Sequence, residues 1–584
     1  MERENESIHL LDMARCEPAS ALSKEFERGK WTMVPYSMDA GAGTMLFCGP
    51  DTQAPPLRLR PGVEGWHHIF VGTYRGPQAQ EACLLIKLGG DPGYTRSVPE
   101  TFRPEKDYVD EGMMPGHTDL CEAYWKTADL TGEEIVFHRP TAGSMAETTT
   151  NIAYLRLVPC SPAEQDRAQR DRTRTDTRRL IANYDGGQHL LWAYATEREM
   201  VDEFQALAES DFKVVLWGCA YNFGTFYPSR VGSEVRWAFG LPGIARNGRA
   251  AVDRRRRHGF DPLKAAVRCA HDIGIRIYPQ IRMEGEQLPP MHRGYGGPGE
   301  FQRQHPEFRC VTRRGHRTRH LSQAFPEVRA KYLDLFREWT EDYGGDGVNI
   351  IFCRSWPYVL YEEPVVESFR DQFSLDIKAL DPFDERVLGH RAGFLTQLLR
   401  ETRAMLDEVG RHRNQRLGTC YVIPGDTYTP EGSPDLGPFT TPRSLGMDVE
   451  TWVREGLVDE LVVHLEDRGQ QDAGDMPGRL RPYRELVQGT TTELYVDLYP
   501  RRQSADSMRV RAMACYDAGA DGLCFWDSHG RAGRLSGWAM HRLLGHREEL
   551  AKMGAFARSL FRLVPMRTLD GFDLEDDFGL PTDG

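Results

Sequence analysis

From Leu180 onward, the chain alternates short apolar runs with longer segments of helical periodicity. Eight of the short runs have the composition of strands, and segments such as TEREMVDEFQALAES and DPLKAAVRCAHDIG lie between them. Strands that alternate with helices indicate parallel pairing, and a count of eight favours a closed (β/α)8 barrel over an open sheet. The eight expected strands are residues 179–186, 212–220, 275–284, 346–354, 416–423, 458–467, 492–500 and 521–527.

Residues 1–160 have a different sequence pattern. Short runs such as GWHHIFVGTY and EEIVFHRP are separated by Gly, Pro and Asp turns without a helical period, which predicts a β-sandwich over residues 1–160. Residues 161–179 carry many charges and almost no apolar side chains, so they predict a linker or an exposed helix between two domains. The expected protein belongs to the α/β class, with a TIM barrel over residues 180–584.

Charge and hydropathy exclude several classes of partner. The 584 residues include 73 Lys and Arg against 86 Asp and Glu, a net charge of -13, which disfavours nucleic acid because phosphate binding needs a basic surface. No run approaches the roughly 20 apolar residues of a membrane span, so no membrane partner is expected. The opening MERENESIHLL lacks the basic-then-apolar order of a secretory signal, which indicates a cytoplasmic protein. Neither the charge nor the hydropathy of the chain excludes an oligomer.

The twelve cysteines are scattered and form no CxxC pair, a pattern typical of reduced thiols and not of a zinc site or a disulfide framework. No G-x-G-x-x-G motif follows any of the expected strands, which argues against a dinucleotide cofactor. The sequence therefore predicts neither a cofactor nor a metal.

The residues at the ends of the expected strands are rich in carboxylates, arginines and aromatic rings. In a barrel these ends meet at one face, where barrels build their sites. Aromatic rings stack on sugar rings and charged groups bind hydroxyls, so this mixture predicts a carbohydrate site. A single acid after a strand is commonly a helix cap, and a histidine in an apolar strand is commonly structural, so the prediction depends on convergence. The expected substrate-binding residues are Asp185, Trp217, Arg282, Glu284, Arg354, Tyr421, His464, Trp526 and Asp527.

One long segment resembles a known family. The run LSQAFPEVRAKYLDLFREWTEDYGGDGVNIIFCR resembles glycosyl-hydrolase-like family ten and its relatives, in which "hPEVR" opens a helix and "DGI" introduces the fourth strand. The segments RAGFLTQLLRETRAML and GADGLCFWD are similar to pieces of uncharacterised bacterial proteins that join an N-terminal β-sandwich to such a barrel. The resemblance spans residues 180–527 and implies a glycosidase-type TIM barrel.

The fourth strand departs from the family pattern D-G-I-x-x-D, because Ile351 stands where the family carries an acid. Two glutamates follow in YEEP, and we expect Glu362 to replace that acid as the general acid/base. The expected partner is Asp497 or Glu466, with Asp185 next. Arg282 and Arg354 are expected to bind an anionic group such as a uronate, or to pair with Glu284 and Glu362.

The expected function is hydrolysis of a glycosidic bond by a carboxylate pair. One alternative is a non-catalytic carbohydrate-binding pseudo-enzyme that lost its acid at Ile351. Another is a carbohydrate lyase or isomerase with Tyr421 or His464 as base. The N-terminal sandwich would be an accessory carbohydrate-binding domain or a structural one.

Overall fold

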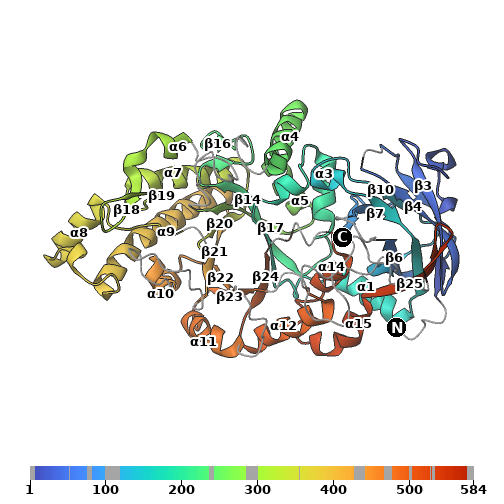
Figure 1. Ribbon diagram of the computed structural model, residues 1–584. Helices are drawn as coiled ribbons and strands as arrows, with labels where there is room; N and C mark the ends of the chain where they lie inside the picture. The colour runs from blue at the N-terminus through green and yellow to red at the C-terminus, as the bar shows by residue number, and fades with distance from the viewer. Residues whose placement is uncertain are drawn as a thin grey trace.

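The computed structural model shows a parallel barrel beside an N-terminal pair of antiparallel sheets (Figure 1). The residues that the structure describes are 7–50, 53–74, 82–98, 119–235, 242–283, 300–353, 356–425, 441–465, 476–498, 503–526, 528 and 533–574.

The N-terminal strands form two sheets, with orders β1-β12-β6-β9-β25-β3-β4-β11 and β5-β10-β7-β8. One apolar cluster takes Leu46 and Ile69 from the first sheet and Leu84 and Ile135 from the second. The two sheets therefore form a sandwich, as the short apolar runs predict. Its strands are β1 (Ile8–Leu10), β2 (Leu22–Ser23), β3 (Trp31–Met38), β4 (Gly41–Cys48), β5 (Leu57–Leu59), β6 (Trp66–Tyr74), β7 (Leu84–Leu88), β8 (Thr95–Ser97), β9 (Asp119–Asp129), β10 (Ile135–His138), β11 (Thr150–Ile152) and β12 (Tyr154–Pro159).

The C-terminal strand β25 (Phe561–Leu569) lies among these N-terminal strands, where Figure 1 draws it in red beside blue. It pairs antiparallel with β9 on one side and β3 on the other, and β26 (Phe572–Asp573) pairs with it. Residues 561–573 thus complete the sandwich and are not part of the barrel, although the sequence predicts a barrel domain that runs to residue 584. The reason is that strand pairing satisfies backbone groups across any sequence separation.

Helix α1 (Pro162–Thr173) occupies the charged segment between the two domains. Ser161 and Glu164 form a capping box at its start, and no residue of the helix is buried. Arg172 donates to the carbonyl of Thr127 at 2.6 Å, on the sandwich side. Of the two alternatives that its composition left open, a linker or an exposed helix, the structure has the exposed helix.

The barrel is closed by eight parallel strands in the order β13-β24-β23-β22-β21-β20-β17-β14, and pairing of β13 with β14 completes the ring. All eight strands expected from the sequence are confirmed. They are β13 (Leu180–Tyr184), β14 (Phe212–Tyr221), β17 (Arg276–Arg282), β20 (Gly347–Ile351), β21 (Gly418–Pro424), β22 (Glu460–His464), β23 (Glu493–Asp497) and β24 (Gly522–Trp526).

Helices surround the barrel, so the strands are buried on both faces, and this explains their continuous apolar runs. The helices are α2 (Gln188–Leu191), α3 (Glu197–Gln205), α4 (Pro242–His258), α5 (Pro262–Asp272), α6 (Glu300–Gln304), α7 (Pro326–Arg337), α8 (Glu363–Phe373), α9 (Glu385–Arg413), α10 (Val449–Arg454), α11 (Met476–Val487), α12 (Ala505–Asp517), α14 (Leu535–His541) and α15 (Gly554–Ser559). Short strands lie in the loops: β15 (Gly224–Thr225), β16 (Ser233–Glu234), β18 (Arg309–Val311) and β19 (Arg317–Leu321).

Side chains along each barrel strand alternate between the interior and the helix layer. On β14, Val214 and Leu216 belong to the interior cluster, while Val215 and Trp217 pack with the helices. This alternation decides which residues at the strand ends face the barrel mouth.

Two further findings concern the whole chain. The twelve cysteines all lie within the described residues, none of them forms a disulfide, and eleven are buried. Within the described ranges, none of the helices is long and apolar enough to cross a membrane.

Candidate active site

The carboxyl ends of five barrel strands bring five of the expected residues into one hydrogen-bonded network. The residues are Asp185 after β13, Arg282 on β17, His464 on β22, Asp497 on β23 and Trp526 on β24. Because these strand ends share one face of the barrel, the network lies where barrel enzymes carry their sites.

His464 and Asp497 form the deeper part of this network. The Nδ1 atom of His464 lies 2.6 Å from Oδ2 of Asp497, and both side chains are almost fully buried. The backbone N–H of Trp526 donates to the other oxygen, Oδ1, at 3.2 Å, and the Trp526 ring lies 5.0 Å from that of His464. The carboxylate therefore fixes the orientation of the imidazole.

Asp185 forms the shallower part. Its Oδ2 atom accepts from the indole Nε1 of Trp526 at 3.0 Å and from Nη2 of Arg282 at 2.6 Å. The side chains of Asp185 and Arg282 are each 13% exposed. Tyr221 braces both, since its hydroxyl donates to the Asp185 carbonyl at 3.0 Å and its ring lies 5.4 Å below the guanidinium.

Trp526 joins the two parts, because its backbone contacts Asp497 and its side chain contacts Asp185. A single residue thus bridges two carboxylates from different strands.

Three buried amides lie in the barrel interior, and none of them is among the site residues expected from the sequence. Asn183, Gln280 and Asn349 occupy inward positions of β13, β17 and β20, because Ile181, Tyr278 and Ile351 on the same strands line the interior. Both amide atoms of Asn183 lack a hydrogen-bond partner. The sequence feature that could have identified these amides is a polar residue at an inward position of an otherwise apolar strand. The amide of Asn183 therefore offers both a donor and an acceptor to a polar guest.

Ile351 is fully buried in the same interior cluster. The position where the family pattern carries an acid therefore faces inward here and bears an apolar side chain.

Glu362 makes its contacts with residues that are not part of this network. Its carboxylate accepts from the backbone N–H of Val311 at 3.2 Å and from that of Leu360 at 2.9 Å, and the side chain is 1% exposed. Burial raises the pKa of Glu362. These contacts fasten hairpin β18–β19 to the start of α8, so they fit a structural carboxylate and do not support the expected general acid/base.

Trp217 and Tyr421 also lie outside the site. Trp217 packs among Tyr184, Tyr194 and Phe204 in the helix layer, and Tyr421 lies against Trp452 there. Both side chains are fully buried. Strand alternation turns them outward, so neither ring is available to a substrate.

Four expected site residues, Glu284, Arg354, Glu466 and Asp527, lie outside the described residues. Among the residues that are described, no group of three or more His, Cys, Asp or Glu side chains could hold a metal ion.

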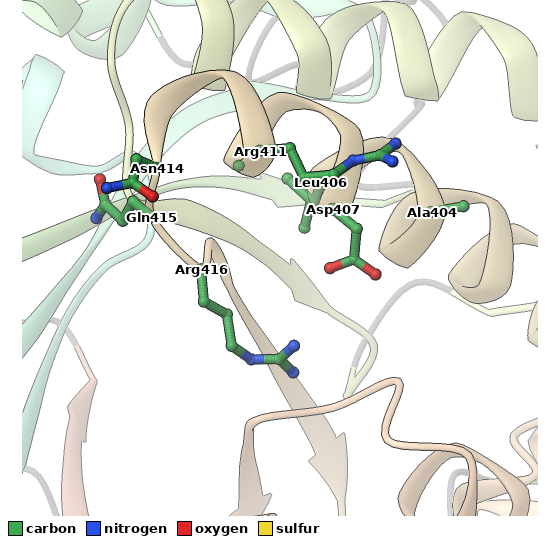
Figure 2. A pocket seen from close by; sticks show the side chains of 8 residues that line it. Ala404, Leu406, Asp407, Arg411, Asn414, Gln415 and Arg416 are labelled. Carbon is green, nitrogen blue, oxygen red and sulfur yellow. The ribbon is translucent and has the colours of Figure 1, made fainter.

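The opposite end of the barrel carries an open groove of about 750 Å³ where α9 ends and β21 begins. Figure 2 shows Asp407 and Arg416 directed toward the space below the helix end. Arg416 pairs with Asp459 at 2.7 Å. This end carries the amino termini of the strands, where conserved residues in barrels serve stability.

No protein-family model matches the chain, and no curated protein matches it. Solved structures with similar folds include a β-galactosidase from the psychrophilic Marinomonas ef1, at 11% identity and a TM-score of 0.40, covering 65% of this chain and 62% of that one. A GH18 chitinase from Pseudoalteromonas aurantia has 13% identity and a TM-score of 0.32, covering 62% and 99%. The GH36 α-galactosidase AgaA from Geobacillus stearothermophilus has 10% identity and a TM-score of 0.34, covering 88% and 65%.

These values assign neither an activity nor a family. The chain spans less than two thirds of the β-galactosidase. The resemblance to family ten remains a prediction.

Proposed function

We propose that the barrel mouth hydrolyses a glycosidic bond in a carbohydrate, with Asp185 and Asp497 as the acid pair. The observation that carries the proposal is the bridge through Trp526, which holds one carboxylate buried against a histidine and the other beside an arginine. Two carboxylates in different environments suit the two roles that glycoside hydrolysis requires.

The two acids would divide the work as follows. Asp185 receives N–H donors from Arg282 and Trp526, which stabilise its negative charge and suit it to face a developing oxocarbenium ion. Asp497 shares a short hydrogen bond with His464, so this pair would exchange the proton with the leaving oxygen. Asn183 beneath them would bind a substrate hydroxyl.

The contact between His464 and Asp497 favours one second candidate, a lyase or isomerase in which His464 is the base. A carboxylate that orients an imidazole is the usual arrangement for proton abstraction by histidine. Tyr421, the other base considered for this reaction, faces the helix layer.

A panel of aryl glycosides and polysaccharides tests these proposals. Wild-type protein should release free sugar, and Asp497→Asn should lose at least a hundredfold in kcat while retaining substrate binding. Asp517→Asn, on the exposed end of α12, is the matched control and should remain fully active. An unsaturated or isomerised product would favour the second candidate, and binding without turnover would contradict both.

A further inference from the structure

A cavity of about 340 Å³ lies between the sandwich and the barrel, separate from the barrel mouth. The sandwich contributes Tyr94, Arg96 and residues 138–142, and the barrel contributes Trp192 and side chains of α3 and α4. Figure 1 shows α3 beside β7 and β10, at the junction of the two domains. None of the residues in the Asp185–Asp497 network lines this cavity.

The walls of the cavity are held by direct contacts between the domains. Asp202 on α3 accepts the backbone N–H of Tyr94 at 2.7 Å, and Gln205 accepts that of Gly93 at 3.1 Å. A side chain at Gly93 would collide with the backbone of Val201, since its Cβ would lie 2.9 Å from the carbonyl oxygen. The site is therefore built by close apposition and is preorganised.

Three of the four lining arginines are each matched by a carboxylate, and the fourth, Arg139, donates to the backbone carbonyls of Pro50 and Ala146, each at 2.8 Å. The pairs are Arg96 with Glu203 at 2.5 Å, Arg198 with Asp202 at 3.2 Å, and Arg254 with Glu199 at 2.6 Å. Such pairs place donors and acceptors next to one another without a large excess of charge. An anionic ligand would need unmatched cations, whereas a sugar hydroxyl both donates and accepts.

Aromatic rings complete the lining. Trp192 and Tyr94 supply ring surface, and the Arg96 guanidinium lies 3.9 Å from the Trp192 ring centre and fixes that ring. His138 also lines the cavity, and burial, together with the charges of Arg139 and Arg198, lowers its pKa to about 4. The imidazole is therefore neutral at pH 7 and adds no charge.

We propose that this interdomain cavity is a second carbohydrate site that binds one neutral sugar unit. Ion-paired donors and acceptors beside aromatic surface suit hydroxyl groups on a ring, and the volume lies within the range of about 300 to 1,000 Å³ typical of ligand pockets. The inference rests on the cavity lining and does not require that the barrel mouth hydrolyse glycosides. The bound sugar would contact both domains at once.

The test measures sugar binding by calorimetry on the full chain carrying Asp497→Asn, so that turnover does not interfere. The probes are glucose, galactose and N-acetylglucosamine as neutral sugars, with glucuronate and inorganic sulfate as charged comparisons. Ala142→Trp fills the cavity, and Arg198→Met removes a half-exposed lining group. Ala163→Trp on exposed α1 and Arg268→Met on α5 are the matched controls.

We expect at least one neutral sugar to bind more tightly than glucuronate or sulfate. The two cavity variants should weaken it at least tenfold, and the two controls should leave it unchanged. Thermal midpoints of the ligand-free variants identify any variant that fails to fold. If one cavity variant fails to fold, sugar binding by the other cavity variant tests the inference.

Three results would overturn the inference: no neutral sugar binds, the charged probes bind as tightly, or binding survives both cavity variants. In the last case the sugar occupies the barrel mouth, so the inference fails while the proposed glycosidase function stands. Conversely, cavity binding in a protein that hydrolyses none of the glycosides would retain the inference and reject the proposed function.

Discussion

His464 Nδ1 lies 2.6 Å from Asp497 Oδ2, and both side chains are buried at the ends of adjacent strands β22 and β23. A pair of this kind ties the position of the imidazole to the carboxylate, so the two side chains should act as a unit.

This coupling predicts the outcome of combining variants. His464→Gln and Asp497→Asn should each reduce kcat by about a hundredfold or more, and the double variant should be little worse than either. Steady-state kinetics on the best aryl glycoside measures this. If the two losses in kcat instead multiply in the double variant, the two side chains contribute independently, and the claim that they act as a unit is wrong.

The Asp185–Arg282 pair predicts how charge on the substrate matters. Because Asp185 already matches the guanidinium, Arg282→Met should lower kcat/KM for neutral and acidic substrates by similar factors. Lys331→Met on α7 is the control for loss of a cation. A loss confined to acidic substrates would instead favour the sequence-based prediction that Arg282 binds a uronate.

Glu362 is expected to affect stability and not turnover. Glu362→Gln replaces a carboxylate oxygen that accepts backbone N–H groups by an amide that donates, which should cost about 1 to 3 kcal/mol of unfolding free energy. The value of kcat should stay within twofold of wild type. Glu363→Gln, on the neighbouring exposed residue, should change neither quantity. Denaturant unfolding and kinetics on both variants check this, and a large fall in kcat for Glu362→Gln alone would restore its catalytic assignment.

Replacement of Asn183 should raise the stability of the protein and lower its activity. Its buried amide lacks a partner, so Asn183→Leu removes an unsatisfied polar group and should raise the free energy of unfolding by about 1 to 3 kcal/mol. If the amide binds a substrate hydroxyl, kcat/KM should fall at least tenfold in the same variant. Gain of stability with unchanged kinetics would contradict the proposed contact.

Asp211 predicts a pH dependence of stability. Burial raises its pKa to about 7, although Thr177 and the Gly545 N–H donate to the carboxylate. The folded protein therefore holds this proton more tightly than the unfolded chain does. The protonated carboxyl stabilises the fold fully below about pH 4, and this stabilisation is lost as the pH rises to 7. Nearby Asp171, Arg174 and His546 share this environment.

Asp211→Asn should remove this pH dependence of the free energy of unfolding. The stability of wild type relative to Asp211→Asn should decline by up to about 4 kcal/mol between pH 4 and pH 7. Unfolding titrations at several pH values measure the difference. A constant difference across this range would mean that the carboxyl does not titrate there.

The sequence predicts the barrel well because strand type, helix period and short connections are local properties. Asp346 and Asp521 show how local such features are: each directly precedes its strand and accepts a backbone N–H from a neighbouring strand, that of Ile277 and that of Leu494. The convergence of five expected residues in one network also follows from the sequence, since parallel strand ends meet at one face.

The remaining predictions depended on information that is not local. Trp217 and Tyr421 belong to strands buried on both faces, so the apolar pattern does not indicate which residues point inward. The acceptor role of Glu362 depends on Val311, which lies 51 residues upstream. For β25, the pairing partners in β9 and β3 are more than 400 residues away.

The position of β25 has a consequence for biosynthesis. During translation, the ribosome releases β9 and β3 long before it releases the strand that lies between them. Until then the two strands carry unpaired edges, and the usual order in which an N-terminal domain folds first does not apply in full. A strand made after the whole barrel therefore closes the sandwich, and a nascent chain stalled before residue 561 would expose an incomplete sheet.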